Sequence, residues 1–236
     1  QRISREISPP EDRRFTGKEN CGILNTFIHP EAFIVELNSF QEEMRHFLPE
    51  IELRFAEPMS RHTSLRIGGP AEVMAFPKTA QELSQILQVS KNLDTKCAIL
   101  GAGTNILAPD AGCRGLVICL KDALTGIRPE GQTGLQVFAG ESLARTAVFA
   151  KNHALTGLEF AHGIPGTLGG GVYMNAGAYG GEMKQVVTSV TVFRMDGTEQ
   201  TLSAEASAFG YRTSVYQTLP CVIVRASLQL QPGDPD

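Results

Sequence analysis

The sequence lacks a long apolar run, an excess of basic residues and paired cysteines. No apolar stretch approaches the ~18–20 residues that span a bilayer, and the charged amino end has no apolar core of a secretion signal behind it. The net charge of -4 provides no basic surface for nucleic acid or an anionic membrane. We therefore expect a cytoplasmic protein that binds neither.

The five cysteines are odd in number and none forms a C-x-x-C pair. A disulfide framework and a metal site are therefore not expected, and reduced thiols fit the cytoplasm. Cys97, Cys119 and Cys221 lie in apolar runs, where cysteine usually acts as a small core residue. The histidines are scattered, with no zinc or nucleophile signature, and no G-x-S-x-G motif of a hydrolase is present.

What the chain does contain is enough apolar material for a core. Its 236 residues suggest one or two domains, and 42% of them are hydrophobic. Residues 1–38 are predicted to be a disordered tail, because Pro9-Pro10, charged residues and Gly17 break any periodicity. A docking arm is the alternative for this segment.

Two capping boxes predict the first helices. Ser39 and Glu42 begin a helix that ends at Pro49, and Thr79 and Glu82 begin a second. The inward face of the first comprises Phe40, Met44, Phe47 and Leu48, and that of the second Leu83, Ile86, Leu87 and Ser90. A third helix is predicted over 142–153, just before Gly157, with Leu143, Ala147 and Val148 facing inward.

The strands fall into two groups. Residues 97–100 and 116–120 are short apolar runs typical of buried strands. After residue 185 the hydrophobic period changes to two, around Val190 and Val192 and again over 222–231. Asp196-Gly197 predicts a type I′ hairpin turn. Helices with short strands come first and strands dominate later, so the predicted class is α+β.

The loop Gly101-Ala102-Gly103-Thr104-Asn105 directly follows the strand that ends at Leu100. Its glycines would let the backbone approach a ligand and turn amides toward an anion. It fails as a dinucleotide fingerprint, because Ile106 stands where the third glycine belongs and Pro109 interrupts any helix. A diphosphate loop of another fold and a plain tight turn both stay open.

A second glycine-rich segment covers residues 163–181, of which eight are glycine. Each glycine costs about 0.5–1 kcal/mol relative to alanine in regular structure. A flat ligand pressed against bare backbone would explain this accumulation, and a close helix crossing or a flexible loop are the alternatives. Flexibility is disfavoured, because Ile164, Leu168 and Val172 are interleaved and favour burial. A shorter pair, Gly68-Gly69 before Pro70, indicates a rigid turn.

Together these segments resemble one family, the UDP-N-acetylenolpyruvoylglucosamine reductases. The resemblance rests on four motifs in register between about residues 51 and 231. They are Ser60-Arg61-His62-Thr63 with Arg66-Ile67-Gly68-Gly69-Pro70-Ala71; Leu100-Gly101-Ala102-Gly103-Thr104-Asn105-Ile106-Leu107; Gly157-Leu158-Glu159-Phe160 with Gly163-Ile164-Pro165-Gly166 and Tyr173-Met174-Asn175-Ala176-Gly177-Ala178-Tyr179-Gly180; and Phe209-Gly210-Tyr211-Arg212-Thr213-Ser214.

The resemblance implies a two-subdomain FAD-binding fold of the vanillyl-alcohol-oxidase/PCMH type, with subdomains at 39–125 and 126–236. It implies a monomer in which FAD binds noncovalently and NADPH is the co-substrate. The implied reaction reduces UDP-N-acetylglucosamine enolpyruvate to UDP-N-acetylmuramate in peptidoglycan precursor synthesis. The cofactor supplies the hydride chemistry, and the protein supplies position and charge.

The same resemblance assigns site residues. Arg212 matches the catalytic arginine, which meets the substrate carboxylate as a bidentate fork, and Tyr211 lies beside it in the substrate site. The implied cofactor-binding residues are Arg66, Gly68, Gly69, Leu100, Gly101, Ala102, Gly103, Thr104, Asn105, Ile106, Gly163, Ile164, Pro165, Gly166, Gly169, Gly170, Asn175, Ala176 and Gly177.

Some positions depart from the family pattern. Ala102 and Thr104 replace residues that are often polar or hydroxylated, and Gly171 stands where alanine is usual. The chain stops at Asp236, before the family's substrate domain with its serine proton donor and a glutamate partner of the arginine. We therefore expect a truncated chain that binds FAD but is catalytically incomplete. Another flavin oxidoreductase of this fold and a non-catalytic flavin-binding module are the alternatives.

Overall fold

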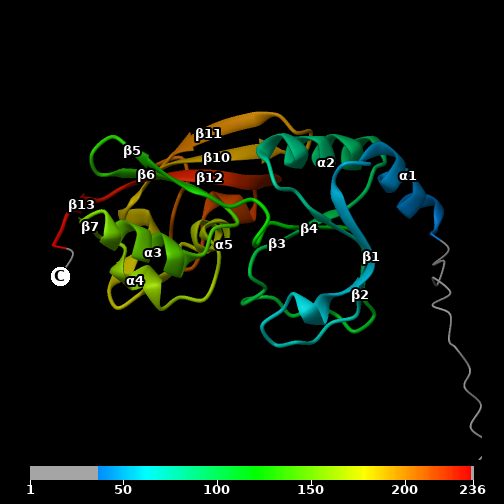
Figure 1. Cartoon of the computed structure of the whole chain (residues 1–236), viewed down its shortest axis with the longest axis horizontal. Coiled ribbons are helices and arrows are strands. Elements are labelled where there is room, and N and C mark those ends of the chain that lie inside the picture. Colours follow the sequence, from blue (N-terminus) through cyan, green and yellow to red (C-terminus); the bar gives the residue numbers. More distant parts are fainter. Residues whose placement is uncertain (1–36, 235–236) are drawn as a thin grey trace, which may run out of the picture. The chain divides into compact units, whose positions relative to one another are not determined.

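A computed structural model of the chain describes residues 37–234 (Figure 1), so all but the last two residues of the predicted tail lie outside the described part. Within that part, no helix combines the length and the apolar character needed to cross a bilayer. Within residues 37–234 the architecture comprises a four-stranded sheet, a five-stranded sheet and two small two-stranded sheets, with helices packed against them, which confirms the predicted α+β class.

The first sheet has the strand order β1-β2-β4-β3. Its strands are β1 (Glu52–Pro58), β2 (Pro70–Phe76), β3 (Cys97–Leu100) and β4 (Cys113–Cys119). β2, β4 and β3 are parallel, and β1 joins β2 antiparallel. Helix α1 (Ser39–Phe47) precedes this sheet, and α2 (Ala80–Asn92) connects β2 to β3. The parallel strands therefore end at one edge, which is where open α/β sheets place ligands.

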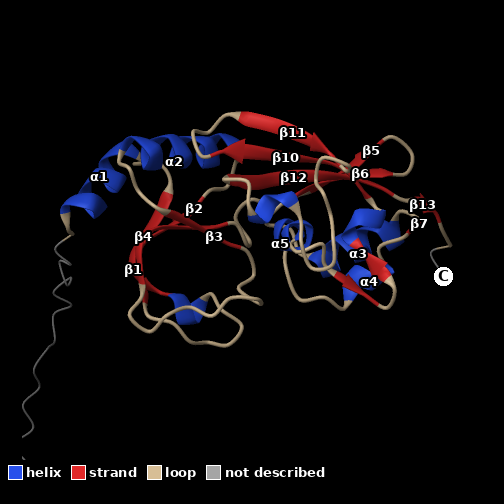
Figure 2. Cartoon of the chain, turned by 180° about the vertical axis from the view of Figure 1, so that it is seen from behind, coloured by secondary structure: helices blue, strands red, loops and turns tan. Residues whose placement is uncertain are grey.

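The second sheet is antiparallel, with the order β11-β10-β12-β6-β5. Its strands are β5 (Ile127–Glu130), β6 (Gly134–Phe138), β10 (Val187–Arg194), β11 (Glu199–Ser203) and β12 (Cys221–Gln229). Figure 2 shows α3 (Leu143–Asn152), α4 (Glu159–His162) and α5 (Leu168–Tyr173) gathered on one side of it.

The smaller elements fall around these two sheets. They are the two-residue strands β7 (Leu155–Thr156), β8 (Gly177–Ala178), β9 (Gly181–Glu182) and β13 (Gln231–Pro232), and the 3-10 turns η1 (Met59–Arg61), η2 (Met183–Gln185) and η3 (Val215–Gln217). The predicted subdomain boundary at residue 125 falls in the loop between β4 and β5. That division stays a prediction.

One buried cluster draws side chains from both sheets and from the helices between them. Leu87 of α2, Ile118 of β4 and Val190 of β10 are completely buried in it. Ser84 Oγ also donates to Gly197 O at 2.9 Å, which ties α2 to the turn of the second sheet. A smaller cluster around Met74 covers the other face of the first sheet.

The start of α1 differs from the prediction. Asn38, not Ser39, caps the helix, and Gln41 completes the capping box in place of Glu42. Asn38 has the extended backbone that a cap residue needs. Phe47 is 53% exposed although the pattern placed it inside, because the helix ends there and its ring contacts the edge of His46.

The other two helices match the prediction more closely. Thr79 caps α2 by accepting from Glu82 N–H, and the predicted inward residues are all buried. The predicted capping box does not close, because the Glu82 carboxylate accepts from Lys78 N–H instead of Thr79 N–H. Ser142 caps α3, and Leu143 and Ala147 are buried as predicted. Val148 is instead 44% exposed, so this one inward assignment is wrong. The helix ends at Asn152, and β7 stands between it and Gly157.

Two strand predictions also need correction. β3 has the predicted bounds but is an edge strand, so Ile99 is 36% exposed and only Leu100 is buried. The Asp196-Gly197 turn is not type I′, because only Gly197 has a positive φ (+81°). Arg194 accepts from Gly197 N–H and its own N–H donates to Thr198 O. This is a three-residue hairpin loop with the glycine in the left-handed position. Such loops are the most common hairpin connections after the two-residue type.

The core predicts a clear stability contrast. We expect Leu87→Ala to lower the free energy of unfolding by about 2–5 kcal/mol, because it empties a fully buried site. Val148→Ala on α3 should change it by no more than about 0.5 kcal/mol. Urea unfolding followed by circular dichroism measures both. A larger loss for Val148→Ala than for Leu87→Ala would contradict the burial of these two side chains.

Candidate functional site

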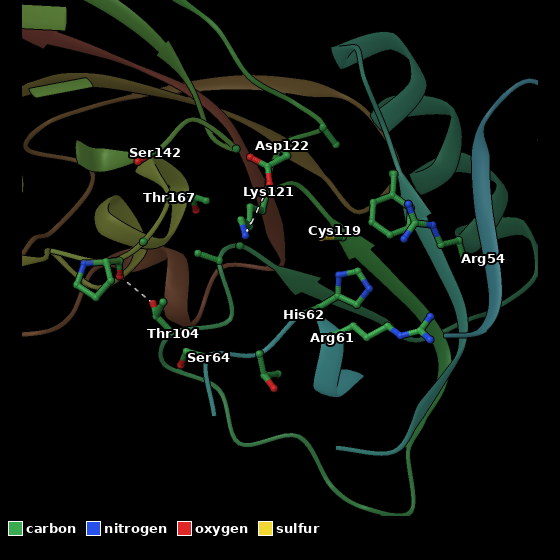
Figure 3. A pocket seen from close by; sticks show the side chains of 18 of the residues that line it. Arg54, Arg61, His62, Ser64, Thr104, Cys119, Lys121, Asp122, Ser142 and Thr167 are labelled. Atoms are coloured by element: carbon green, nitrogen blue, oxygen red, sulfur yellow. Dashed lines mark hydrogen bonds and ion pairs between the residues drawn. The ribbon is translucent and has the colours of Figure 1, made fainter. Parts of the chain in front are cut away.

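Two adjoining hollows lie between the loops of the two sheets, with volumes of about 970 and 590 Å³. Both are lined by Gly101, Ala102, Thr104 and residues 165–167. The two glycine-rich segments are therefore neighbours in space and form a rim common to both hollows. Thr104 Oγ donates to Pro165 O at 2.9 Å across this rim, as the dashed line in Figure 3 shows.

The first glycine-rich loop contains several backbone N–H groups that have no hydrogen-bond acceptor in the described part of the chain. The amides of Ala102, Gly103, Thr104 and Asn105 donate no hydrogen bond to any residue in the described range 37–234. All four residues line the larger hollow. Several free amides on one concave loop favour an anion such as a phosphate. The loop thus fits the diphosphate role that its composition suggested.

Glycine is needed in this loop for packing as much as for a ligand. Gly103 has φ +64°, and a Cβ on it would lie 2.0 Å from His62 O. Ser64 N–H donates to Gly103 O at 3.0 Å, so the two backbones are in direct contact. A Cβ on Gly101 would lie 2.6 Å from Thr167 Oγ. These contacts bring the loop against both the 62–64 segment and the second glycine-rich segment.

The second segment offers bare backbone rather than donors. Leu168 N–H donates to Glu141 O and Gly169 N–H to Ala139 O, both at 2.8 Å. The first backbone amides of α5 therefore already have hydrogen-bond acceptors inside the protein. Gly166 lines both hollows, and the nearest atom to a Cβ added there is 3.7 Å away. This open backbone fits a flat ligand lying against it.

Some predicted site residues line the larger hollow and some do not. The lining residues are Gly101, Ala102, Gly103, Thr104, Asn105, Ile106, Ile164, Pro165, Gly166, Gly169, Gly170, Ala176 and Arg212. Neither hollow is lined by Arg66, Gly68, Gly69, Leu100, Gly163, Asn175, Gly177 or Tyr211. Cofactor contact by this second group is not visible in the geometry of the chain, and it stays a prediction.

The residues outside the lining have structural roles where contacts are visible. Gly69 lets the backbone pass Asp110, because a Cβ on it would lie 2.1 Å from Asp110 O. Leu100 is buried in the smaller core cluster. Asn175 is also buried, and its side chain bonds within the protein. Arg66 has φ +54°, and its side chain is exposed.

Arg212 lies on a tight turn beside the larger hollow. Its backbone is left-handed, with φ +55°, and its Nη2 donates to Gly177 O at 3.0 Å. Tyr211 is 90% exposed, and its ring centre lies 5.8 Å from the guanidinium carbon of Arg212. The guanidinium is therefore held at one point and retains donors for an anion.

The smaller hollow has a charged rim that the sequence interpretation did not include. The basic residues that line it are Arg54, Arg61, His62, Lys78 and Lys121, and the acidic ones are Glu52 and Asp122. Figure 3 labels all of these except Lys78 and Glu52. Lys78 and Lys121 each follow a parallel strand by two residues. Position at the carboxyl ends of parallel strands is the signal that could have identified them.

Glu57 contacts three of these basic side chains. It is buried and accepts from His62 Nε2 at 2.8 Å, with Arg54 and Arg61 at 3.6 and 3.8 Å. Burial alone raises the pKa of the Glu57 carboxyl, but the hydrogen bond from His62 and the charges of His62, Arg54 and Arg61 outweigh it. The pKa of Glu57 therefore lies below its ordinary value, and the carboxylate stays ionised.

The thiols near the hollows are not activated. Burial raises the pKa values of Cys119 and Cys221 to about 11, so both stay protonated at neutral pH. Among residues 37–234, no group of three or more histidine, cysteine or acidic side chains is arranged to hold a metal. Backbone amides and basic side chains are therefore the groups around these hollows that suit an anionic ligand.

The sequence model of one protein family, described as FAD binding domain, matches residues 71–203, which is more than half of the chain. This chain belongs to the FAD-binding domain family. The matched range contains both glycine-rich segments and both sheets in large part, and it confirms the predicted cofactor type.

Relatives with similar sequences carry the name of one particular enzyme. It is 42% identical over 188 residues to UDP-N-acetylenolpyruvoylglucosamine reductase of Lactococcus lactis subsp. cremoris, covering 80% of the chain and 62% of the relative. The enzyme of the same name from Streptococcus thermophilus is 42% identical over 193 residues, covering 82% and 63%. The chain thus spans less than two thirds of the length of these relatives.

Solved structures agree on the fold. UDP-N-acetylenolpyruvylglucosamine reductase from Thermus caldophilus superposes with a TM-score of 0.64 at 32% identity, covering 78% of this chain and 64% of that one. Chitooligosaccharide oxidase superposes with a TM-score of 0.62 at 16% identity, covering 80% and 43%. At that identity the oxidase shows only the fold. The predicted FAD-binding fold of the vanillyl-alcohol-oxidase/PCMH type is confirmed.

Glu57 predicts a pH dependence of stability. A carboxyl whose folded pKa is depressed contributes stability above its ordinary value of 4.5 and loses it as the pH falls through the folded value. We expect Glu57→Gln to be less stable than the parent at pH 7 and to lose less stability than the parent as the pH falls below 4.5 toward the depressed folded pKa. Urea midpoints at several pH values measure this. Parallel pH curves for parent and variant would contradict the assignment.

Gly103 predicts a backbone requirement. Gly103→Ala should lower the free energy of unfolding by more than about 1 kcal/mol, because it combines a positive φ with a clash against His62 O. Gly163→Ala serves as the matched control, since nothing lies within 4 Å of its Cβ position. Thermal unfolding distinguishes them. Equal stability of the two variants would show that the close approach is not real.

Proposed function

We propose that this chain binds FAD noncovalently and forms the flavin-binding part of a UDP-N-acetylenolpyruvoylglucosamine reductase. The observation that carries the proposal is the rim common to both hollows, where Gly101, Ala102 and Thr104 meet residues 165–167. The amides of Ala102 and Thr104 donate no hydrogen bond within residues 37–234. The 42% identity to enzymes of that name supports the choice among flavoproteins.

The two hollows suit the shape of a dinucleotide. FAD has a central diphosphate between two ring systems, so the diphosphate belongs at the common rim and one ring system in each hollow. Ala102 and Thr104 present amides there, and the basic side chains Arg61 and Lys121 line the smaller hollow. Volumes of about 590 and 970 Å³ lie in the range of pockets for small ligands.

The proposed reaction is the reduction of UDP-N-acetylglucosamine enolpyruvate to UDP-N-acetylmuramate, with NADPH as co-substrate, in the cytoplasm. FAD, when bound, supplies the hydride chemistry. Arg212 binds the carboxylate of the enolpyruvyl group and stabilises the enolate charge that develops beside it. Its place on the larger hollow supports this role, because Nη2 is the one guanidinium nitrogen with a hydrogen bond among residues 37–234. A monomer that binds neither nucleic acid nor membrane is part of the proposal.

FAD binding is tested by a charge placed on the loop. Ala102→Asp should raise the Kd for FAD at least about tenfold, because its carboxylate would repel the diphosphate at short range. Ala102→Asn has nearly the same shape without the charge, and it should bind FAD within a few-fold of the parent. Quenching of flavin fluorescence on titration measures both. A parent protein that takes up no FAD would refute the proposal outright.

The role of Arg212 is tested by separating charge from geometry. In the full-length protein, Arg212→Gln should lower the rate of product formation by about 10²–10³-fold while FAD binding is retained. Arg212→Lys keeps the charge but loses the fork, so it should recover only part of that loss. Turnover is measured as NADPH oxidation that depends on the enolpyruvyl substrate. Full activity of Arg212→Gln, or oxygen-driven turnover of an alcohol, would point to another flavoprotein function.

A further inference from the structure

Asn175 belongs to the second glycine-rich segment, but its side chain turns away from both hollows. It is 2% exposed and lines neither of them. Its Nδ2 donates to Gly210 O at 2.8 Å and to Glu182 Oε2 at 2.7 Å, and its Oδ1 accepts from Lys184 N–H at 2.9 Å. Every polar atom of this amide is therefore engaged inside the protein, and none is free for a ligand.

Gly210, whose carbonyl accepts from Asn175, is the first residue of the turn that contains Arg212. Gly210 and Thr213 are bridged by backbone hydrogen bonds on either side of Tyr211 and Arg212. Asn175 thus clamps the base of this turn to the segment that directly follows α5. The clamp connects segments that are 35 residues apart in the chain.

A second set of contacts holds the other side of the turn. Gln217 Nε2 donates to Arg212 O at 3.1 Å and to Tyr173 O at 3.3 Å. Ser214 Oγ donates to Tyr173 O at 2.7 Å. The turn is therefore attached at both ends to the carboxyl end of α5, which lies next to the larger hollow.

Within residues 37–234 the turn has few other side-chain contacts. Tyr211 is 90% exposed, Arg212 has a left-handed backbone, and its guanidinium donates one hydrogen bond, to Gly177 O. Thr213 Oγ1 also donates to Gln217 Oε1 at 3.2 Å. A non-glycine residue at positive φ costs on the order of 1–3 kcal/mol and persists only where neighbours impose it. The neighbours that impose it here are the side chains of Asn175, Ser214 and Gln217.

We propose that Asn175 is a positioning residue, which fixes the Arg212 turn against α5 so that the guanidinium faces the larger hollow. This inference rests on the proposed role of Arg212. The second glycine-rich segment then has two roles, because part of it lines the hollows while Asn175 bonds the Arg212 turn. The left-handed backbone of Asn175 itself (φ +43°) explains why asparagine suits this position, since asparagine tolerates that region and can still bond.

The test uses variants that separate backbone from side chain. Asn175→Gly keeps the left-handed backbone and removes the clamp. Asn175→Asp keeps the shape but places a carboxylate oxygen against Gly210 O and the Glu182 carboxylate. Gln217→Met removes the second clamp at an exposed site, in case both Asn175 variants fail to fold. Thr188→Val is the control, because Thr188 is exposed and its side chain, within the described part of the chain, bonds only Ser227 O on the second sheet.

The readouts are the FAD Kd, the rate of flavin reduction by NADPH, and kcat for the enolpyruvyl substrate, all on the full-length protein. We expect kcat to fall on the order of 10²-fold in Asn175→Gly and Asn175→Asp, as a displaced catalytic group does. Gln217→Met should lower kcat in the same direction. The FAD Kd should stay within about twofold of the parent in all of them. Thr188→Val should match the parent throughout.

Three results would overturn the inference. Full kcat in Asn175→Gly would show that the clamp is not needed. A tenfold or greater rise in the FAD Kd would make Asn175 a cofactor contact instead, as its motif suggested. A loss in Asn175→Gly that persists in an Arg212→Gln background would show that it does not act through Arg212. If Arg212→Gln itself has no effect, the proposed function fails, and that outcome is separate from a failure of the clamp alone.

Discussion

The close contact of backbones at Gly101 and Gly103 is the constraint on which the site depends. A side chain at either position would enter space held by Thr167 Oγ or His62 O. Because these glycines allow the approach, the loop after β3 reaches both the first sheet's 62–64 segment and the second glycine-rich segment. Both hollows are lined by residues of this junction, and the amides of residues 102–105 donate no hydrogen bond within the described range 37–234.

Charge is arranged locally around this junction. The chain has a net charge of -4, yet the smaller hollow is lined by more basic than acidic side chains. Glu57 is ionised and hydrogen-bonded to His62, and it lies within 4 Å of Arg54 and Arg61. A mildly acidic protein can therefore still present a basic pocket to a diphosphate. Net charge excluded nucleic acid as an expected partner but carried no information about this pocket.

Local patterns predicted the elements well where neighbours in sequence decide the outcome. The cap at Thr79 and the buried face of α2 follow from helix geometry alone, and both are confirmed. Phe47 and Val148 are exposed because no other element within residues 37–234 covers those positions, which periodicity cannot reveal. The cap of α1 moved by one residue, because Asn38 and Ser39 are both good caps and tertiary contacts chose between them.

The sequence by itself determined the class, the glycine-rich segments and the family, because these depend on residue types at fixed spacing. Tertiary structure decided which members of those segments meet the cleft. Asn175 and Gly166 belong to the same motif, yet one bonds Gly210 and the other lines both hollows. Lys78 and Lys121 carry no motif and become pocket residues only because two parallel strands end side by side. Burial and bonding partners depend on contacts between residues distant in the chain, and spacing along the sequence does not specify those contacts.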